Sequence, residues 1–464
     1  MAANGPYSAV PPNPSIPAST VVRLDRRRFL HVAGVAGAAA GVSSITAGCA
    51  TKSTTAGTRP VRIGLVSNQT GSLAGFGEAD SVVTANVRTA LKDSIKIDGT
   101  TYPLEILLRD TGSQPARAAL VAQDLINNAK VDLLLTAGAP EIVNPAANMA
   151  EKLGTPCLST NVPWQAWFYG RQPKGQPPRP FNWTYHFFWG LEDVIAVWNG
   201  IWTQVPNNKV IAGVFTTDPD GNAWADPKTG LPSAFKPRGY TFIQDPRPEV
   251  GTQSYTQLLS RFKANDAQIM TGVIPPTDFA TLWQQTNEMG FRPPLITIGK
   301  ALLFPAFLEV LNPSPVGLTG TCTWHPAWPY SSSLTGQSCA QWAAEYTRQT
   351  FRQWNQAIGT VHALFEVAIS VLQRAGVGDA QAIADAIQNT SMDTILGHVS
   401  WVKGPNKGLP PIAQKNVAKT PLVGGQWIAA AKGRFPFEQV IVTNAGHPNI
   451  PVARGAEPLP AQRS

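Results

Sequence analysis

The stretch that decides the fold runs from residue 61 to residue 91 and reads VRIGLVSNQTGSLAGFGEADSVVTANVRTAL. Its first six residues, Val61 to Val66, form a short apolar run that predicts a buried strand. From Glu78 to Leu91 the apolar residues recur with helical spacing, which predicts an amphipathic helix. A buried strand followed by a helix is the repeating unit of an α/β fold with a parallel sheet.

The same alternation continues outward from this unit in two sets. In the first set we predict strands at 104–108, 131–136 and 156–159, with helices at 116–128 and 144–153. An aromatic- and Pro-rich interval separates it from the second set. There we predict strands at 210–215, 269–274 and 295–298, and helices at 194–202, 255–263, 279–289, 338–350, 360–374 and 379–388. Because each set needs its own core, we expect two similar α/β lobes.

The composition excludes a nucleic-acid partner. The 464 residues include 37 basic and 29 acidic residues, a net charge of +8. Residues 1–48 hold four of those arginines and one aspartate, so the rest of the chain carries 33 basic and 28 acidic residues, or +5. No later segment gathers four basic residues, whereas phosphate binding needs a concentrated patch.

The N-terminal 48 residues are typical of an export signal. Arg26-Arg27-Arg28-Phe29-Leu30 precedes an apolar run from Val32 to Ala47 that is rich in Ala and Gly. The paired arginines resemble a twin-arginine signal. A transmembrane anchor is the alternative, but the run is interrupted by glycine and a span needs about 20 strongly apolar residues.

Ala47-Gly48-Cys49 resembles a bacterial lipobox, in which the cysteine is acylated and becomes the mature N-terminus. Residues 49–59 would then be a flexible tether to the membrane; simple cleavage of the signal is the alternative. Of the other cysteines, we expect a buried thiol at Cys157 and a possible disulfide between Cys322 and Cys339, because the chain is predicted to be exported.

Known catalytic, cofactor and metal motifs do not occur in the sequence. Gly75-Phe76-Gly77 lacks the third glycine of a dinucleotide loop, so we expect a helix-capping turn there. The six histidines are isolated, no GxSxG elbow is present, and no cysteine pair has metal spacing. Glu192 and Asp193 are adjacent and are expected to form a solvated first helical turn. We therefore expect a protein that is not an enzyme and has no cofactor or metal.

Several stretches resemble, in order and spacing, the branched-chain amino acid type of solute-binding protein that feeds ABC importers. The resemblance covers about residues 60 to 430. Its motifs are the first strand with Thr70-Gly71 and Gly75-Phe76-Gly77-Glu78, Arg109-Asp110-Thr111 with Gln114-Pro115, Asn144-Pro145-Ala146, Gly154-Thr155-Pro156, and Gly397-His398-Val399-Ser400-Trp401.

This resemblance implies a type I periplasmic-binding-protein fold, with two Rossmann-like lobes that close over one ligand. It implies that residues 60–187 plus 322–388 form lobe 1, residues 188–321 plus 389–445 form lobe 2, and residues 446–464 form a tail. The partners it implies are a small-molecule ligand and the ABC permease subunits, and the lipid anchor adds the outer face of the cytoplasmic membrane.

The resemblance also places the candidate ligand-binding residues on the loops that face the cleft. They are Phe76, Ala139, Pro140, Glu141, Asn161, Trp164, Pro275, Thr277, Lys300 and Gln356. The Ser/Thr pair that holds an amino-acid carboxylate in relatives is missing, and Lys300 stands where relatives carry an acid. Lys300 would repel an ammonium group.

Tryptophan is unusually frequent, with 14 residues, and six of them fall between residues 164 and 202. We expect most of these side chains in the core and Trp164 as a stacking wall of the cleft. Together with Lys300, this favours an aromatic or apolar carboxylate over an ordinary amino acid. A sensing receptor of the same fold and a secreted enzyme are the alternatives to transport.

Overall fold

The computed structural model describes residues 59–402 and 408–460. The predicted export signal at 1–48, the acylation site Cys49 and the tether up to residue 58 lie outside the described residues. No helix in the described part of the chain is both long and apolar enough to span a lipid bilayer.

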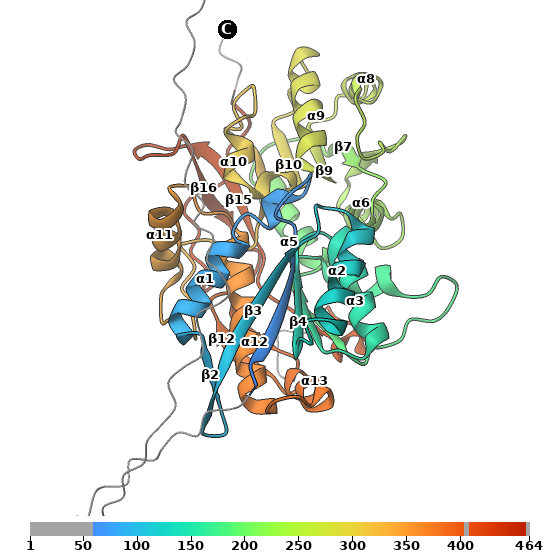
Figure 1. The fold of residues 1–464 in the computed structure, drawn as a ribbon. Helices are drawn as coiled ribbons and strands as arrows, with labels where there is room; N and C mark the ends of the chain where they lie inside the picture. Colours follow the sequence, from blue (N-terminus) through green and yellow to red (C-terminus); the bar gives the residue numbers. More distant parts are fainter. Residues whose placement is uncertain (1–58, 403–407, 461–464) are drawn as a thin grey trace, which may run out of the picture. The chain divides into compact units, whose positions relative to one another are not determined.

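The first seven-stranded sheet has the order β14-β6-β5-β4-β1-β3-β2. Figure 1 labels its strands β2, β3 and β4. Its neighbouring strands run parallel except for the β2–β3 hairpin. The strands are β1 (Val61–Ser67), β2 (Ser94–Ile97), β3 (Thr100–Asp110), β4 (Leu133–Ala137), β5 (Cys157–Thr160), β6 (Thr184–Phe187) and β14 (Val417–Ala418).

The second seven-stranded sheet has the order β16-β15-β11-β10-β9-β7-β8. Strands β7 to β11 pair in parallel, whereas β15 pairs antiparallel with both β11 and β16. Its strands are β7 (Val210–Phe215), β8 (Thr241–Ile243), β9 (Ile269–Ile274), β10 (Leu295–Lys300), β11 (Thr319–Cys322), β15 (Val423–Ala429) and β16 (Phe437–Thr443). Both sheets are therefore mixed, not purely parallel.

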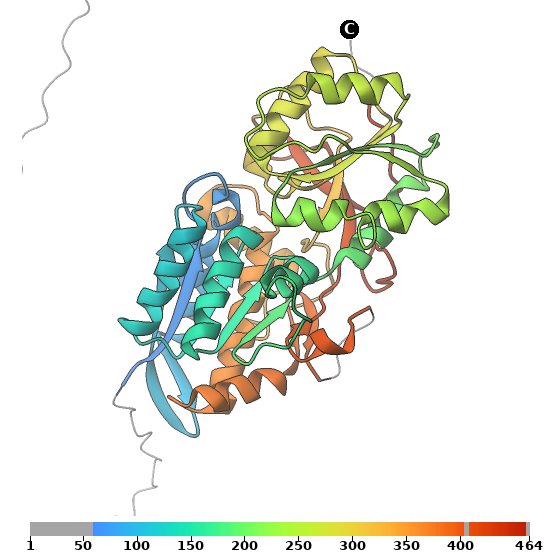
Figure 2. The same cartoon turned by 90° about the vertical axis from the view of Figure 1, so that its right-hand side faces the viewer.

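Helices cover both faces of each sheet (Figure 2). The longer ones are α1 (Asp80–Leu91), α2 (Pro115–Asn127), α3 (Pro140–Leu153), α5 (Leu191–Trp202), α8 (Thr256–Ala264), α9 (Pro276–Glu288), α11 (Cys339–Thr350), α12 (Ala357–Ala375) and α13 (Ala380–Gln388). The short ones are α4 (Trp164–Phe168), α6 (Pro219–Ala225), α7 (Leu231–Phe235), α10 (Pro305–Leu308) and α14 (Pro411–Gln414), with 3-10 turns η1 (Ala74–Phe76), η2 (Tyr169–Arg171), η3 (Lys236–Arg238) and η4 (Ala301–Leu303).

Successive strand residues enter different cores, as expected for a sheet buried on both faces. In β4, Leu133 and Leu135 join the core on one face, and Leu134 joins the core on the other. In β9, Ile269 and Met270 likewise belong to the two separate cores of the second sheet.

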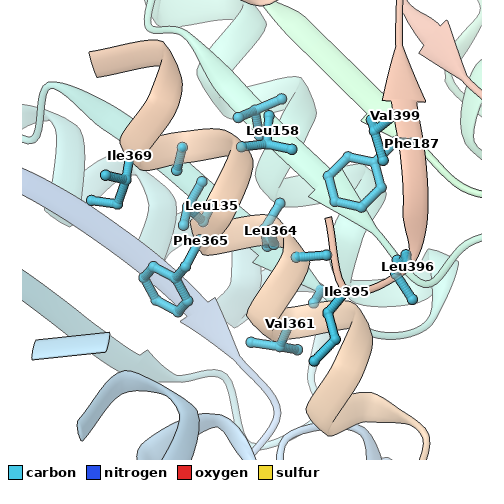
Figure 3. Packing of buried hydrophobic residues seen from close by; sticks show 14 of the residues in the cluster. Leu135, Leu158, Phe187, Val361, Leu364, Phe365, Ile369, Ile395, Leu396 and Val399 are labelled. Carbon is cyan, nitrogen blue, oxygen red and sulfur yellow. The ribbon is translucent and has the colours of Figure 1, made fainter. Parts of the chain in front are cut away.

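Helix α12 forms the centre of the largest core. Figure 3 shows Val361, Leu364, Phe365 and Ile369 of this helix packed among Leu135 and Leu158 of the first sheet and Ile395, Leu396 and Val399. The helix is buried on nearly every side, which explains why its sequence is apolar around its whole circumference.

Three chain segments connect the two sheets. They follow β6, β11 and β14, and the first and third pair through Phe188 N–H donating to Ala418 C=O at 3.0 Å. The hairpin β12 (Ser391–Thr394) and β13 (Gly397–Ser400) was grouped with lobe 2 in the sequence analysis, but its apolar residues pack in the core of the first sheet.

Candidate functional site

A cavity lies where strands of both sheets reach their carboxyl ends, the usual ligand position in open α/β sheets. It is lined by Phe76, Ala139, Asn161, Pro163, Phe188, Trp189, Asp220, Trp224, Val273, Gly299, Lys300, Leu303, Phe304, Thr321, Thr323, Gln356 and Ala357. Its empty volume, mouth included, is about 560 Å³.

Five aromatic side chains form the apolar walls. Phe76 belongs to the turn after β1, and Phe304 follows η4 beside the second sheet. Their rings meet edge to face with centroids 4.8 Å apart, an arrangement that aromatic pairs favour. Phe188 and Trp189 come from the connection after β6, and Trp224 comes from α6. The aromatic walls thus include contributions from both lobes and from a connecting segment.

Gly75 leaves room for the close approach of Phe304 to the turn that carries Phe76. A Cβ atom at this position would lie 2.8 Å from Cγ of Phe304, closer than real Cβ contacts. The expected turn at Gly75-Phe76-Gly77 is present as η1, and its glycine lets Phe304 approach the first lobe.

Lys300 is the centre of the charged side of the cavity. Its Nζ lies 2.9 Å from Oε1 of Glu141, 3.4 Å from Oδ2 of Asp218 and 3.3 Å from Oδ2 of Asp220. Glu141 stands in the first turn of α3 in lobe 1, and the other three residues belong to lobe 2. One buried ammonium group therefore bridges the lobes and contacts three carboxylates.

This cluster changes the protonation of its members. Burial disfavours the charged form of Lys300 and lowers its pKa, but the charges of Glu141, Asp220 and Asp218 outweigh burial, and the net pKa is raised. Burial raises the pKa of Asp220 to about 7; Lys300 opposes this rise, and Glu141 and Asp218 add to it. Lys300 is thus held in its charged form, whereas Asp220 exchanges its proton near neutral pH.

The backbone of two residues in the cavity is also unusual. Asn161 has φ 70° and Lys300 has φ 67° with ψ −59°, a region that side-chain-bearing residues rarely adopt. Such strain persists only where the surroundings enforce it.

Another group of polar side chains ties the cavity to the connecting segments. Gln356 precedes α12, and its Oε1 accepts from the backbone N–H of Thr323 at 2.6 Å and from the Thr323 hydroxyl at 2.9 Å. Its Nε2 donates to Thr321 C=O at 3.1 Å and to Gln439 Oε1 at 3.0 Å. Both polar atoms of the Gln356 side chain are therefore hydrogen-bonded, and these bonds fix the start of α12 to β11 and β16.

The structure brings half of the ten predicted binding residues to the cavity wall: Phe76, Ala139, Asn161, Lys300 and Gln356. Glu141 contacts the cavity through Lys300, and Pro140 is the buried first residue of α3. Pro275 caps α9, and Thr277 lines a separate, more open hollow that shares Phe304.

Trp164 does not line the cavity. Its indole Nε1 donates to Oε1 of Glu192 at 2.9 Å, and its ring packs in the core around α4. The sequence analysis missed Trp189 and Trp224, the tryptophans that do line the cavity, and Asp220. Asp220 could have been predicted, because it lies in the first turn of α6 after β7, and ligands of open α/β sheets bind at the carboxyl ends of strands.

Three further expectations need correction. Lys300 is not free to meet an anionic ligand group, because three carboxylates already hold it. Cys322 and Cys339 are free thiols in the structure, with Sγ atoms directed at Trp324 C=O and Ile395 C=O respectively. Glu192 and Asp193 are not a solvated turn, because both pair with the buried Lys419 at 2.6 and 2.8 Å.

The described part of the chain contains no group of three His, Cys, Asp or Glu residues that could hold a metal ion. Cys157 is a buried thiol, as predicted, and burial raises its pKa to about 12.

Comparison with known proteins places this geometry in a family. The family described as periplasmic binding protein matches residues 60–412. Among solved structures, a solute-binding protein of an ABC transporter from Rhodopseudomonas palustris, in complex with 3,4-dihydroxybenzoic acid, has 15% identity and a TM-score of 0.63, covering 83% of this chain and 99% of that one. A leucine-binding protein from Thermotoga maritima has 19% identity and a TM-score of 0.60, covering 82% and 98%.

A third solved structure is the branched-chain amino acid transporter substrate-binding protein of Streptococcus pneumoniae in complex with isoleucine. It has 16% identity and a TM-score of 0.61, covering 82% of this chain and all of that one. These likenesses confirm the predicted type I periplasmic-binding-protein fold with two lobes.

Proposed function

Because the chain belongs to the family of periplasmic binding proteins, we propose that it captures a small organic solute by closure of its two lobes and delivers it to the permease of an ABC importer. Membership of the family implies a location outside the cytoplasm. The solute would be bound and released without chemical change.

The observation that carries this proposal is the cavity itself. Both lobes and the connecting segments supply its walls, so a bound solute would contact the two lobes at once. A ligand that contacts both lobes binds the closed form better than the open form and therefore shifts the population toward closure.

The solute class that we propose is amino-acid-like or an aromatic or apolar carboxylate. The five aromatic walls support an apolar or aromatic portion. One of the similar solved structures holds 3,4-dihydroxybenzoic acid, and another holds isoleucine.

We further propose that the mature chain begins at an acylated Cys49 and is held at the outer face of the cytoplasmic membrane. Ala47-Gly48-Cys49 and the preceding twin arginines support this proposal. Radiolabelled palmitate should be incorporated into the wild-type chain in cells and not into Cys49→Ala; equal labelling would contradict the anchor.

Mass spectrometry of the protein purified without denaturation tests the capture of a solute. We expect a small organic molecule to be released on unfolding, and Ala139→Phe, which fills the cavity, to retain none. Leu120→Ala, an exposed position far from the cavity, serves as the matched control. Cells that lack this protein should lose uptake of the same molecule. Recovery of a converted product after incubation, or unchanged uptake, would contradict the proposal.

A further inference from the structure

A separate hollow in lobe 1 lies at the edge of the first sheet where strands β5 and β6 begin. Lys152, at the end of α3, comes shortly before β5, and Asn182 comes shortly before β6; both line this hollow, which we call the basal hollow. Its empty volume, mouth included, is about 1050 Å³. The cavity between the lobes lies at the opposite, carboxyl ends of these strands and shares no lining residue with it.

Arg171, which lines the basal hollow, is a buried cation whose hydrogen-bond partners are neutral. The residue is 8% exposed, and its guanidinium lies between the rings of Trp167 and Phe181, 4.5 and 4.0 Å from their centroids. Its Nε donates to Asn148 Oδ1 at 2.8 Å, and its Nη2 donates to the Thr184 hydroxyl at 2.9 Å. Its Nη1 is buried and has no hydrogen-bond partner within the described part of the chain.

The positive charge of Arg171 persists in this buried place. Burial lowers its pKa to about 10, so the group stays charged at neutral pH. The carboxylate of Glu151, the one acid in the lining, is used elsewhere: it accepts from the backbone N–H groups of Asn182 at 2.7 Å and Trp183 at 3.0 Å, and from the Thr184 hydroxyl at 3.1 Å. Because a buried charge is costly unless it is paired, an anion in the hollow would stabilise Arg171.

Two exposed cations stand at the same hollow. They are Lys152 and Arg179, and Arg179 is held there by a closed loop. Gln172 Nε2 donates to Arg179 C=O at 3.0 Å, and Arg179 N–H donates to Gln172 Oε1 at 3.1 Å. Prolines at 173, 177, 178 and 180 restrict the backbone of this loop. Little backbone order would therefore have to be gained when a ligand binds.

Three basic residues and one acidic residue give the lining of the basal hollow a net charge of +2. We propose that this hollow binds a phosphate group, with Lys152 and Arg179 contacting its oxygens at the mouth and Arg171 supplying the fixed positive charge of the inner wall. A phosphate suits three cations better than a carboxylate does, because it offers more acceptor oxygens and carries up to two negative charges. This site is additional to the proposed capture of a solute.

The phosphate comes either from a soluble molecule or from the headgroup of a phospholipid. The second source is within reach of a chain that is acylated at Cys49. Strand β1 begins at the same edge of the sheet, twelve residues after Cys49, and β6 is the third strand from β1 in the sheet order, about 15 Å away. The basal hollow would then lie on the side of lobe 1 that is tethered to the membrane.

Calorimetric titration of inorganic phosphate into the protein tests the site. Arg179→Gln and Lys152→Gln should each weaken phosphate binding about 5- to 10-fold, and the double variant should show no binding. Both residues are exposed, so these variants should fold like the wild type. Arg238→Gln, an exposed arginine of lobe 2, is the matched control. Ala139→Phe, which fills the cavity between the lobes, should bind phosphate as the wild type does.

A vesicle assay distinguishes the two sources of phosphate. The Cys49→Ala chain, which cannot be acylated, is sedimented with vesicles of phosphatidylglycerol or of phosphatidylcholine, with and without the double substitution. Sedimentation with phosphatidylglycerol vesicles that the double substitution abolishes would support the headgroup. Binding of inorganic phosphate without such sedimentation would support a soluble phosphate.

Three results would overturn the inference. They are an absence of binding in both assays, phosphate binding that the double variant retains, and phosphate binding that Ala139→Phe abolishes, since the last would place the anion between the lobes. None of these results bears on whether the protein captures and releases a solute, which the mass spectrometry described above tests separately.

Discussion

Asp220 has a proton equilibrium that follows from its place in the cavity. Burial raises its pKa from 3.8 to about 7, with Lys300 opposing the rise and Glu141 and Asp218 adding to it. Between pH 3.8 and pH 7, Asp220 is therefore mostly protonated in the folded state and mostly ionised in the unfolded state. Stability from this group is fully present below pH 3.8 and is lost as the pH rises through 7.

Replacement of Asp220 by Asn should remove this part of the pH dependence. Between pH 5 and pH 8 the free energy of unfolding of the wild type should fall more than that of Asp220→Asn, by about 2 kcal/mol or more. Urea unfolding of both proteins at the two pH values measures the difference. Parallel pH profiles would show that Asp220 does not titrate in the folded protein.

At the scale of elements, the sequence predicted the parts that are buried and regular. Strands β1, β7, β9 and β10 are continuous apolar runs, and α1, α2, α9 and α12 repeat their apolar residues with helical spacing, so each was predicted within a few residues. Strand β15 was missed because Gly424 and Gly425 interrupt its pattern of apolar residues. Both glycines lie against neighbouring side chains that leave no room for a Cβ atom. Strand β6 was missed inside the aromatic-rich interval.

Only half of the predicted binding residues line the cavity, because the position of a residue after a strand can be predicted but the direction of its side chain cannot. Residues such as Phe76 and Asn161 follow the ends of predicted strands, and that position alone brings them to the cavity. Trp164 and Pro163 are adjacent, yet the start of α4 turns the indole toward Glu192 and leaves the proline at the wall. The contact of Lys300 with Glu141 joins the two lobes, and sequence spacing does not reveal such a contact.

Gly359 allows helix α12 to pack closely against Trp324. In an exposed helix a Gly-to-Ala change stabilises by about 1 kcal/mol. At Gly359, inside α12, a Cβ atom would lie 2.2 Å from Cγ of Trp324. We expect Gly359→Ala to destabilise the protein by about 1–3 kcal/mol instead, because overpacking forces Trp324 to move.

Thermal and urea unfolding measure this effect. Ser370→Ala, on a half-buried position of the same helix, is the control and should change stability by less than about 0.5 kcal/mol. Because Gln356 and Ala357 at the start of α12 line the cavity, a shift of this helix should also weaken solute binding. A Gly359→Ala protein as stable as the wild type would contradict the packing argument.

At the scale of the whole molecule, two of the contacts between the lobes lie beside the cavity. One is the edge-to-face pair of Phe76 and Phe304, and the other is the ion pair of Glu141 and Lys300. If Glu141 leaves, Lys300 keeps Asp218 and Asp220 within its own lobe. The ion pair can therefore open and close without leaving a buried ammonium unpaired, as a reversible interlobe contact requires.

Glu141→Gln should consequently favour the open form without unfolding either lobe. A charged hydrogen bond is worth about 1.5–3 kcal/mol, so the closed-to-open ratio of the solute-free protein should fall about 10-fold or more. Small-angle X-ray scattering should show a larger radius of gyration for the solute-free variant, and saturating solute should restore the wild-type value. Glu105→Gln, which breaks an exposed ion pair with Arg62 inside lobe 1, is the control and should leave the scattering unchanged. An unchanged radius in Glu141→Gln would show that the ion pair of Glu141 and Lys300 does not hold the lobes closed.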